Sequence, residues 1–485
     1  MVEKIINKIK EDKNLRIFLG IFLFGAFLRF FQVTTEGLWY DEVLTALSMK
    51  MSFFDMIKDR LGGGHSPFYF IIIYPFCKIF GTGELAVRLP SVIASILSIW
   101  VFYLLTRKLF SDMRVVNLST FFFSISALQI YFAQEARMYA FVILFVIMSF
   151  YFLLRALDEN DWKIWLCYVL STAGFFYLSA ATIPIIFAQI VYVLLKRKKY
   201  ADYLLAFSFI VLLYVPMAYF YLSMRKLGFI EWLPPIKLMT FIQILYGFGF
   251  YPVPVYEAGQ ITQVYLAVAK VLSLLLLGGL IIFGLLASFI RRSHEGKELF
   301  SFYFNKDSNA AIVSAFWLLV PIIVMAAYSF LRQPIFGPKR YVIALAPAYY
   351  LLLSIGVMKI RWGWLRKAIV ALLIVFFILA LITFYNVPTR EDWRGAIAYI
   401  DSNLKTGETI VGDLATTKAY EYYGRSKDVK ISPPMFLNVK SIHGKWMLMK
   451  VLDFNRYFGT GEQLEKNFDT VEKLNFNGLK MYYVK

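Results

Sequence analysis

Long apolar runs alternate with short polar segments along most of this 485-residue chain. A helix of about 20 apolar residues is long enough to cross the hydrocarbon core of a bilayer. The pattern therefore predicts about 11 membrane-spanning helices, all of them before residue 388. The expected spans are residues 15–33, 86–106, 115–133, 138–157, 163–179, 181–195, 202–222, 262–290, 310–330, 341–359 and 367–386.

The segments between the spans carry two further predictions. Apolar residues recur at helical spacing between 43 and 54, and Ser52 begins a capping-box pattern that restarts a helix. Residues 67–80 are apolar but too short to cross comfortably, and Pro75 interrupts them. Both pieces are typical of amphipathic helices that lie along a membrane surface. Residues 223–261 are expected to form a long loop whose prolines break regular structure.

Composition and charge set the class of protein and its orientation. The chain is 59% hydrophobic, with a mean hydropathy of +0.62, which predicts a polytopic helical membrane protein. Its net charge of +19 comes from short basic clusters between the apolar runs, not from one basic face. This is the positive-inside pattern, so no nucleic acid is expected as a partner. It predicts a multi-pass protein of the cell membrane with its N-terminus in the cytoplasm, and the odd number of spans places the C-terminal part outside.

The composition becomes that of a soluble protein from residue 388 onward. Residues 391–404 have the pattern of an amphipathic helix and residues 408–413 that of a strand, with further strand-like runs at 445–451 and 479–484. We therefore expect two domains, a transmembrane domain over 1–387 and a small extracytoplasmic α/β domain over 388–485.

The predicted topology gathers polar residues of both charges at the outer face of the membrane. The acid-bearing loops contain Asp41 and Glu42, then Gln134 and Glu135; the candidate cations are His65, Arg137, Lys339 and Arg340. A carboxylate can serve as a general base, and cations beside it can bind a phosphate. Trp39, Tyr40 and Tyr139 could stack on a sugar.

Each of these residues also has a simpler interpretation. Asp41 and Glu42 could solvate a helix end, Arg137 and Arg340 could snorkel from helix ends, and His65 could sit in a glycine-rich turn. No phosphate-binding P-loop, dinucleotide fingerprint or zinc-protease motif occurs, and the two cysteines suggest neither a disulfide nor a metal site. The case for an active site therefore depends on the convergence of separate loops.

Five short motifs resemble a known family. In order, they are Leu38-Trp39-Tyr40-Asp41-Glu42, His65-Ser66-Pro67-Phe68-Tyr69, Glu84-Leu85-Ala86-Val87-Arg88-Leu89-Pro90-Ser91, Gln134-Glu135-Ala136-Arg137-Met138-Tyr139 and Glu391-Asp392-Trp393-Arg394-Gly395. Together they resemble the GT-C glycosyltransferases, in particular the branch of the protein O-mannosyltransferases and the lipid A aminoarabinose transferase.

The resemblance implies a GT-C fold and a polyprenyl-phosphate sugar as donor, used at the extracytoplasmic face, in general with inversion at the anomeric carbon. It implies that Asp41 is the base and Glu135 the second acid, with His65 where relatives have a phosphate-binding basic residue. Arg340, with Lys339, is the candidate for the remaining phosphate charge. No cofactor is expected to be obligatory, although the acidic loops could hold Mg²⁺ or Mn²⁺. The acceptor could be a protein, a lipid or a glycan.

Two other classes of protein stay open. A transporter or flippase for a lipid-linked or anionic substrate would carry ionisable residues within its spans and internal repeats. Here the charges lie at the outer rim and no repeat is visible, which favours an enzyme. A non-catalytic assembly or receptor subunit is the other alternative.

Overall fold

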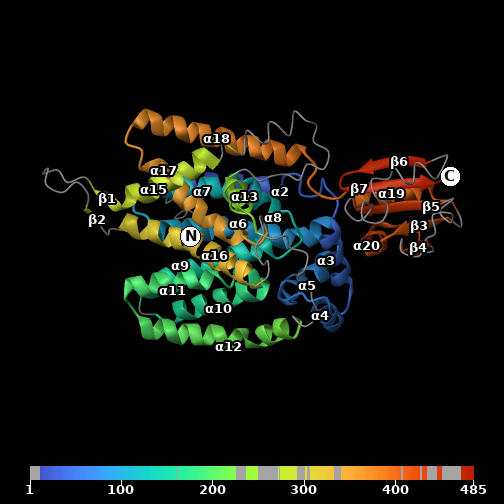
Figure 1. Ribbon diagram of the computed structural model, residues 1–485, viewed down its shortest axis with the longest axis horizontal. Coiled ribbons are helices and arrows are strands. Elements are labelled where there is room, and N and C mark those ends of the chain that lie inside the picture. The colour runs from blue at the N-terminus through green and yellow to red at the C-terminus, as the bar shows by residue number, and fades with distance from the viewer. Residues whose placement is uncertain are drawn as a thin grey trace.

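The computed structural model describes residues 11–159, 161–224, 236–249, 271, 274–291, 301–302, 306–332, 340–405, 408–426, 429–433, 445–450 and 471–484. Within these ranges the chain forms a helical bundle followed by a small domain built on a β-sheet (Figure 1). The two parts follow one another along the longest axis, and the helical part is the larger.

Apolar runs account for most helices of the bundle. The helices are α2 (Lys13–Phe30), α6 (Glu84–Leu109), α7 (Met113–Ile125), α8 (Ala127–Ala133), α9 (Tyr139–Asp158), α10 (Trp162–Leu178), α11 (Ile185–Lys196), α12 (Tyr200–Met224), α13 (Leu238–Gly249), α15 (Gly279–Phe289), α16 (Lys306–Leu331), α17 (Ala346–Met358) and α18 (Gly363–Asn386). Short helical turns are η1 (Ala180–Thr182), η3 (Leu274–Gly278) and η4 (Ile343–Leu345), and β1 (Ile290–Arg291) pairs with β2 (Ser301–Phe302).

Five of the described helices are long and apolar enough to cross a membrane: α6, α9, α12, α16 and α18. The pair α7 and α8, bent by 53°, gives a sixth if it is one span. The remaining apolar helices are shorter, so the total of eleven stays a prediction. Helix α13 lies within residues 223–261, so the expectation of a loop without regular structure is wrong there.

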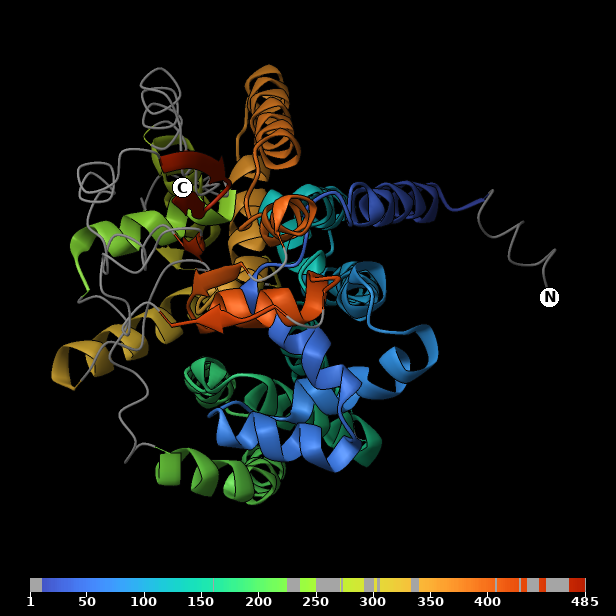
Figure 2. The ribbon, with the colours of Figure 1, turned by 90° about the vertical axis from the view of Figure 1, so that its right-hand side faces the viewer.

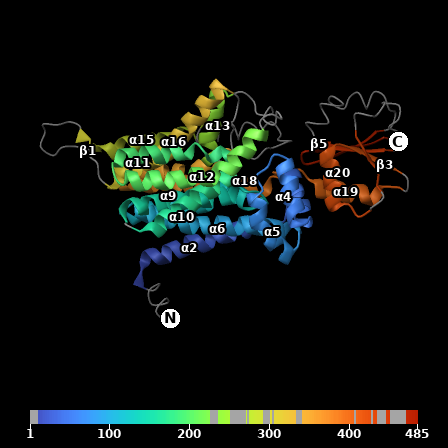
Figure 3. The same ribbon diagram turned by 90° about the horizontal axis from the view of Figure 1, so that it is seen from below.

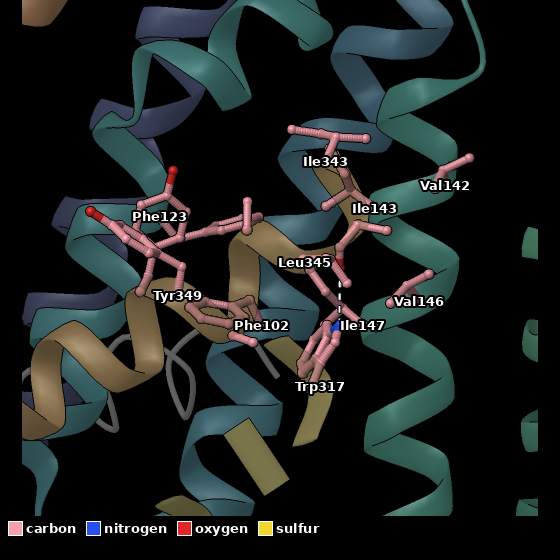
Figure 4. Packing of buried hydrophobic residues seen from close by; sticks show 14 of the residues in the cluster. Phe102, Phe123, Val142, Ile143, Val146, Ile147, Trp317, Ile343, Leu345 and Tyr349 are labelled. Atoms are coloured by element: carbon pink, nitrogen blue, oxygen red, sulfur yellow. Dashed lines mark hydrogen bonds between the residues drawn. The ribbon is translucent and has the colours of Figure 1, made fainter. Parts of the chain in front are cut away.

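Aromatic and aliphatic side chains pack together in the core between the helices (Figure 4). Trp317 of α16 stacks on Phe150 of α9 at 4.0 Å between ring centroids, and its indole nitrogen donates a hydrogen bond of 2.9 Å to the Ala344 carbonyl. Phe102 of α6 stacks in the same way on Phe123 of α7. These residues are buried, and the bundle is therefore closely packed away from its ends.

Three helices lie at the end of the bundle that faces the sheet, here called the sheet-side end (Figure 3). They are α3 (Tyr40–Lys50), α4 (Phe53–Gly62) and α5 (Phe68–Phe80), where two amphipathic helices were expected. The Ser52 hydroxyl accepts a hydrogen bond from the Asp55 amide and so caps α4 as the sequence predicts. Helix α5 continues through Pro75, which does not end it.

The C-terminal domain has the α/β character that its composition predicts. Helices α19 (Trp393–Asn403) and α20 (Leu414–Tyr423) accompany a five-stranded sheet in the order β4-β3-β5-β7-β6. The strands are β3 (Thr409–Gly412), β4 (Ile431–Ser432), β5 (Lys445–Lys450), β6 (Val471–Phe476) and β7 (Leu479–Val484). Strand β3 is parallel to β4 and β5, and the other pairs are antiparallel. Asn477-Gly478 forms the tight turn between β6 and β7, with Gly478 at φ +70°.

Candidate active site

Three residues far apart in the sequence meet at the sheet-side end. Asp41 lies in the first turn of α3, Arg137 in the turn between α8 and α9, and Arg340 before η4. Asp41 Oδ2 is 3.7 Å from Arg340 Nη1 and 3.9 Å from Arg137 Nη2. Both separations exceed a normal hydrogen bond. The carboxylate is thus drawn toward two cations without being saturated by them, and its side chain is 24% exposed.

The neighbouring acid, Glu42, lies in a different environment. It is fully buried, and its two carboxylate oxygens accept hydrogen bonds of 2.8 and 2.6 Å from the Arg88 guanidinium of α6. The Ala136 amide donates a third, of 2.7 Å. Burial alone would raise the pKa of Glu42, but Arg88 and Arg390 hold it below its usual value. Glu42 therefore fastens α3 to α6 and to the 134–138 turn.

Glu135 is the third acid at this end. It is 1% exposed, and within the described residues its Oε2 has no hydrogen-bond partner. Burial raises the pKa of Glu135 to about 8, and the nearby carboxylates of Glu42 and Asp41 add to this rise while Arg390 and Arg137 oppose it. At neutral pH this side chain is mostly protonated.

Gln134 serves the structure of the turn. Its side-chain amide donates hydrogen bonds to the carbonyls of Arg29 (3.2 Å) and Phe31 (2.7 Å), and its own carbonyl accepts one from Arg390. The side chain is buried. These hydrogen bonds attach the start of the turn to the end of α2.

The aromatic candidates surround the acids in different ways. Tyr139 is buried and packs edge-on against Phe132 at 4.8 Å. Tyr40 is half-buried, and the Lys450 ammonium of β5 lies 4.5 Å from its ring centroid. The indole nitrogen of Trp39 is buried and, within the ranges given above, has no hydrogen-bond partner. The Trp39 indole can therefore donate a hydrogen bond to a bound molecule.

The other predicted cations are His65 and Lys339. His65 lies between α4 and α5 and is exposed. Partial burial and the charges of Arg137 and Arg60 lower its pKa to about 4, so it is neutral near pH 7. Lys339 lies outside the described residues.

Arg88 and Arg390 are site residues that the sequence analysis did not single out. Arg88 was noted only within a motif, although a charged residue at the start of a predicted span is itself a signal. Arg390 follows the last span and precedes the Glu391-Asp392-Trp393-Arg394-Gly395 motif. Its side chain is 4% exposed and reaches the carbonyl of Gln134 at 2.9 Å.

The spacing of possible metal ligands was compared among the described residues only. Within the described part of the chain, no three His, Cys, Asp or Glu side chains are close enough together to hold a metal ion. Glu42 is committed to Arg88, and Glu135 carries a proton at neutral pH. The expectation that no metal is obligatory therefore stays a prediction.

The chain is similar to known proteins in part of its sequence and in its fold. Residues 64–221 match the family described as dolichyl-phosphate-mannose-protein mannosyltransferase. ArnT from Cupriavidus metallidurans in the apo state superposes with a TM-score of 0.54 at 12% identity, covering 96% of this chain and 97% of ArnT. The apo oligosaccharyltransferase from Archaeoglobus fulgidus superposes with a TM-score of 0.55 at 12% identity, covering 98% and 75%. None of the curated proteins matches the chain in sequence.

The fold is that of the GT-C glycosyltransferases. This confirms the predicted fold class over nearly the whole chain. The matched family and these neighbours are glycosyltransferases that use lipid-linked donors. Two neighbours were solved with a carrier lipid: ArnT is bound to undecaprenyl phosphate, and AglB from Archaeoglobus fulgidus is in complex with an inhibitory peptide and a dolichol-phosphate.

Proposed function

We propose that this protein is a membrane glycosyltransferase that moves a sugar from a polyprenyl-phosphate carrier to an acceptor at the extracytoplasmic face. The observation that carries the proposal is the position of the Asp41 carboxylate, part-exposed between the Arg137 and Arg340 guanidinium groups. The shared fold and the family match over residues 64–221 support it.

The reaction needs one base and a site for a phosphate. In the proposed step, an acceptor hydroxyl or amine attacks the anomeric carbon of the donor while Asp41 takes its proton. The bond from that carbon to the phosphate oxygen breaks, and polyprenyl phosphate leaves with the electron pair. Arg137 and Arg340 then stabilise the charge on the phosphate. Attack from the side opposite the leaving group inverts the anomeric centre.

The remaining candidates receive supporting roles. We assign Trp39, Tyr40 and Tyr139 to a sugar or acceptor subsite, because the first two precede Asp41 in the chain and Tyr139 begins α9 just after Arg137. Glu135 is the second acid of the site, and it lies in the turn that carries Arg137. We assign Glu42 a positioning role, because both its oxygens are taken by Arg88. No step is routed through a metal, since the guanidinium groups supply the positive charge.

Purified protein in lipid nanodiscs, supplied with synthetic polyprenyl-phosphate sugars and a choice of peptides, glycolipids and oligosaccharides, tests this proposal. Release of polyprenyl phosphate and labelling of the acceptor are measured together. We expect Asp41→Asn to lower kcat by about 10²- to 10⁴-fold. We expect Arg340→Ala to raise the KM for the donor by about 10- to 100-fold, because a charged hydrogen bond is lost.

Asp202→Asn is the matched control, since this exposed acid lies in the first turn of α12, away from the site. It is expected to leave kcat and KM unchanged. Transfer by Asp41→Asn at the parent rate would overturn the role of Asp41. Movement of intact donor between leaflets without release of polyprenyl phosphate would indicate a flippase instead.

A further inference from the structure

The segment before Asp41, residues 34–40, is fastened along its length to the C-terminal part of the chain. The amide of Leu38 donates a hydrogen bond of 2.6 Å to the Tyr423 hydroxyl of α20, and that of Tyr40 donates one of 3.3 Å to Glu391. The other contacts run from Arg394 to the carbonyls of Thr34 and Thr35, and from Thr389 to the carboxylate of Glu36. Figure 2 shows the C-terminal domain in front of the blue helices, and α20 of that domain contacts α3.

Arg390 extends this attachment into the interior of the site. Its Nη2 donates a hydrogen bond of 2.9 Å to the carbonyl of Gln134, beside Glu135. Its Nη1 lies 3.7 Å from Glu36 Oε2, and its Nε lies 3.8 Å from Glu42 Oε2. One guanidinium thus contacts both loops that carry the candidate acids.

The C-terminal domain holds the backbone of Arg390 in turn. The side-chain amide of Asn477, in the β6–β7 turn, donates a hydrogen bond of 2.5 Å to the Arg390 carbonyl. The Asp392 amide donates one of 3.0 Å to the Asn477 carbonyl. The backbone from which the Arg390 side chain extends is therefore tied to the β6–β7 turn of the sheet.

We propose that Arg390 is a positioning residue for Asp41, and that the C-terminal domain is through it a structural part of the active site. The inference rests on the proposed function, since it needs Asp41 to act as the base. Arg390 fixes the 34–40 segment against the 134–138 turn, which carries Glu135 and Arg137. This sets the geometry of the carboxylate and of a cation that lies beside it.

Loss of Arg390 is expected to slow the reaction for a geometric and an electrostatic reason. A base must lie within about 3 Å of the proton that it removes, and a misplacement of about 1 Å can cost about 10²-fold in rate. Removal of Arg390 would leave Glu36 and Glu42 facing one another across the space of the lost guanidinium. Repulsion between them would displace the 34–40 segment, and the hydrogen bond that ties this segment to the Gln134 carbonyl through Arg390 would be lost. Donor binding by Arg340 would be affected less, because Arg340 precedes η4 and belongs to neither loop.

The test compares Arg390→Ala with Arg425→Ala, an exposed arginine of the same domain. In nanodiscs we expect Arg390→Ala to lower kcat by about 30-fold or more. The KM for the donor should rise less than in Arg340→Ala, because the displaced turn carries Arg137 but not Arg340. Added guanidinium at millimolar concentration restores part of the lost kcat, because it can occupy the vacated space. Arg425→Ala keeps the parent kcat and shows no response to guanidinium.

Amide hydrogen exchange over residues 36–42 adds a readout that requires no substrate. We expect faster exchange at Leu38 and Tyr40 in Arg390→Ala than in the parent or in Arg425→Ala. If Arg390→Ala does not fold, Asn477→Ala tests the same attachment, with an expected loss in kcat of about fivefold at unchanged KM.

The two proposals fail in different ways. A parent protein that transfers no sugar overturns the proposed function, whereas the exchange result still decides whether Arg390 holds the 34–40 segment. An active parent whose kcat is unchanged by Arg390→Ala, or by Asn477→Ala, overturns the positioning role.

Discussion

The three carboxyl groups of the candidate active site lie in three different environments. Asp41 is part-exposed between two cations at 3.7 and 3.9 Å, Glu42 is saturated by Arg88, and Glu135 is buried with a partnerless oxygen in the described structure. The same functional group can therefore serve as a base, as a fixed ion and as a protonated acid. The identity of the residue alone would not have separated these roles.

Glu135 gives a prediction for the dependence of stability on pH. The pKa of Glu135 rises from 4.5 in the unfolded chain to about 8 in the fold. Between these values the folded state holds a proton that the unfolded chain has lost, so stability falls as pH rises through this range. We expect Glu135→Gln to match the parent near pH 5 and to be more stable by roughly 2–4 kcal/mol at pH 9.

Thermal unfolding in detergent from pH 5 to pH 9 measures this difference. Glu421→Gln is the control, because Glu421 is an exposed acid on α20. It should change stability by less than about 0.5 kcal/mol at either pH. Parallel curves for the parent and Glu135→Gln would show that Glu135 is ionised in the fold.

At the scale of single residues, the sequence pointed to some of the site and not to the rest. Asp41, Arg137 and Arg340 each stand in a polar interruption beside an apolar run, where a functional charge is recognisable. Arg88 and Arg390 act on partners that are 46 and 256 residues away in the sequence. No local pattern reveals such a partner, so their part in the site could be found only from the fold.

At the scale of elements, α15 and α17 show how closely two helices can approach. A Cβ atom added to Gly356 would lie 2.0 Å from the Leu280 carbonyl oxygen, and one added to Gly284 would lie 2.6 Å from Gly356. Small residues at such a crossing let the helix backbones come into contact, which favours association of helices in lipid. The prolonged apolar runs predicted the helices themselves, but not this contact.

We therefore expect Gly356→Ala to separate α15 from α17 and to destabilise the protein by about 1–3 kcal/mol. Gly363→Ala, at the start of α18, is the matched control, since a Cβ atom added there would meet no described atom within 4 Å. It should be neutral or slightly stabilising. Thermal unfolding of both variants in detergent measures the effect. Equal melting temperatures for the two variants would contradict the close contact.

The limits of prediction at this scale have a clear cause. Apolar length predicted helices such as α6, α9 and α16 because burial in a bilayer or a core requires an apolar surface in either case. An apolar run therefore does not tell a membrane span from a helix buried in the protein core, and the number of spans stayed open. The short helix α17, for example, is buried on all sides within the bundle. Helix α13 was missed because the prolines around it outweighed its own apolar pattern.

At the scale of the whole molecule, the proposed function requires the candidate site and the C-terminal domain to be outside the cytoplasm. Both lie at the sheet-side end. Lys198 lines a cavity with Lys108 and Asp158, which stand at the C-terminal ends of α6 and α9, opposite the helix ends that carry Arg88 and Tyr139. Single cysteines at Ser402 and Lys198, both exposed, test this arrangement after the native cysteines are replaced with alanine.

We expect a membrane-impermeant maleimide to label Ser402→Cys in intact cells, and to label Lys198→Cys only after the membrane is opened. The cysteine-free protein is the control for background labelling. Labelling of Lys198→Cys in intact cells, with Ser402→Cys protected, would place the site in the cytoplasm and exclude an extracytoplasmic transfer.

The attachment of residues 34–40 also constrains when the enzyme can begin to work. The hydrogen-bond partner of the Tyr40 amide, Glu391, is 351 residues further along the chain. That of the Leu38 amide, Tyr423, is 385 residues further. At a synthesis rate of about 5–20 residues per second, the ribosome needs roughly 20 to 80 seconds to supply these partners. A nascent chain that stops between Arg340 and Arg390 would contain Asp41, Arg137 and Arg340 but not the C-terminal residues that align them. Such a chain would be inactive and would not consume the lipid-linked donor.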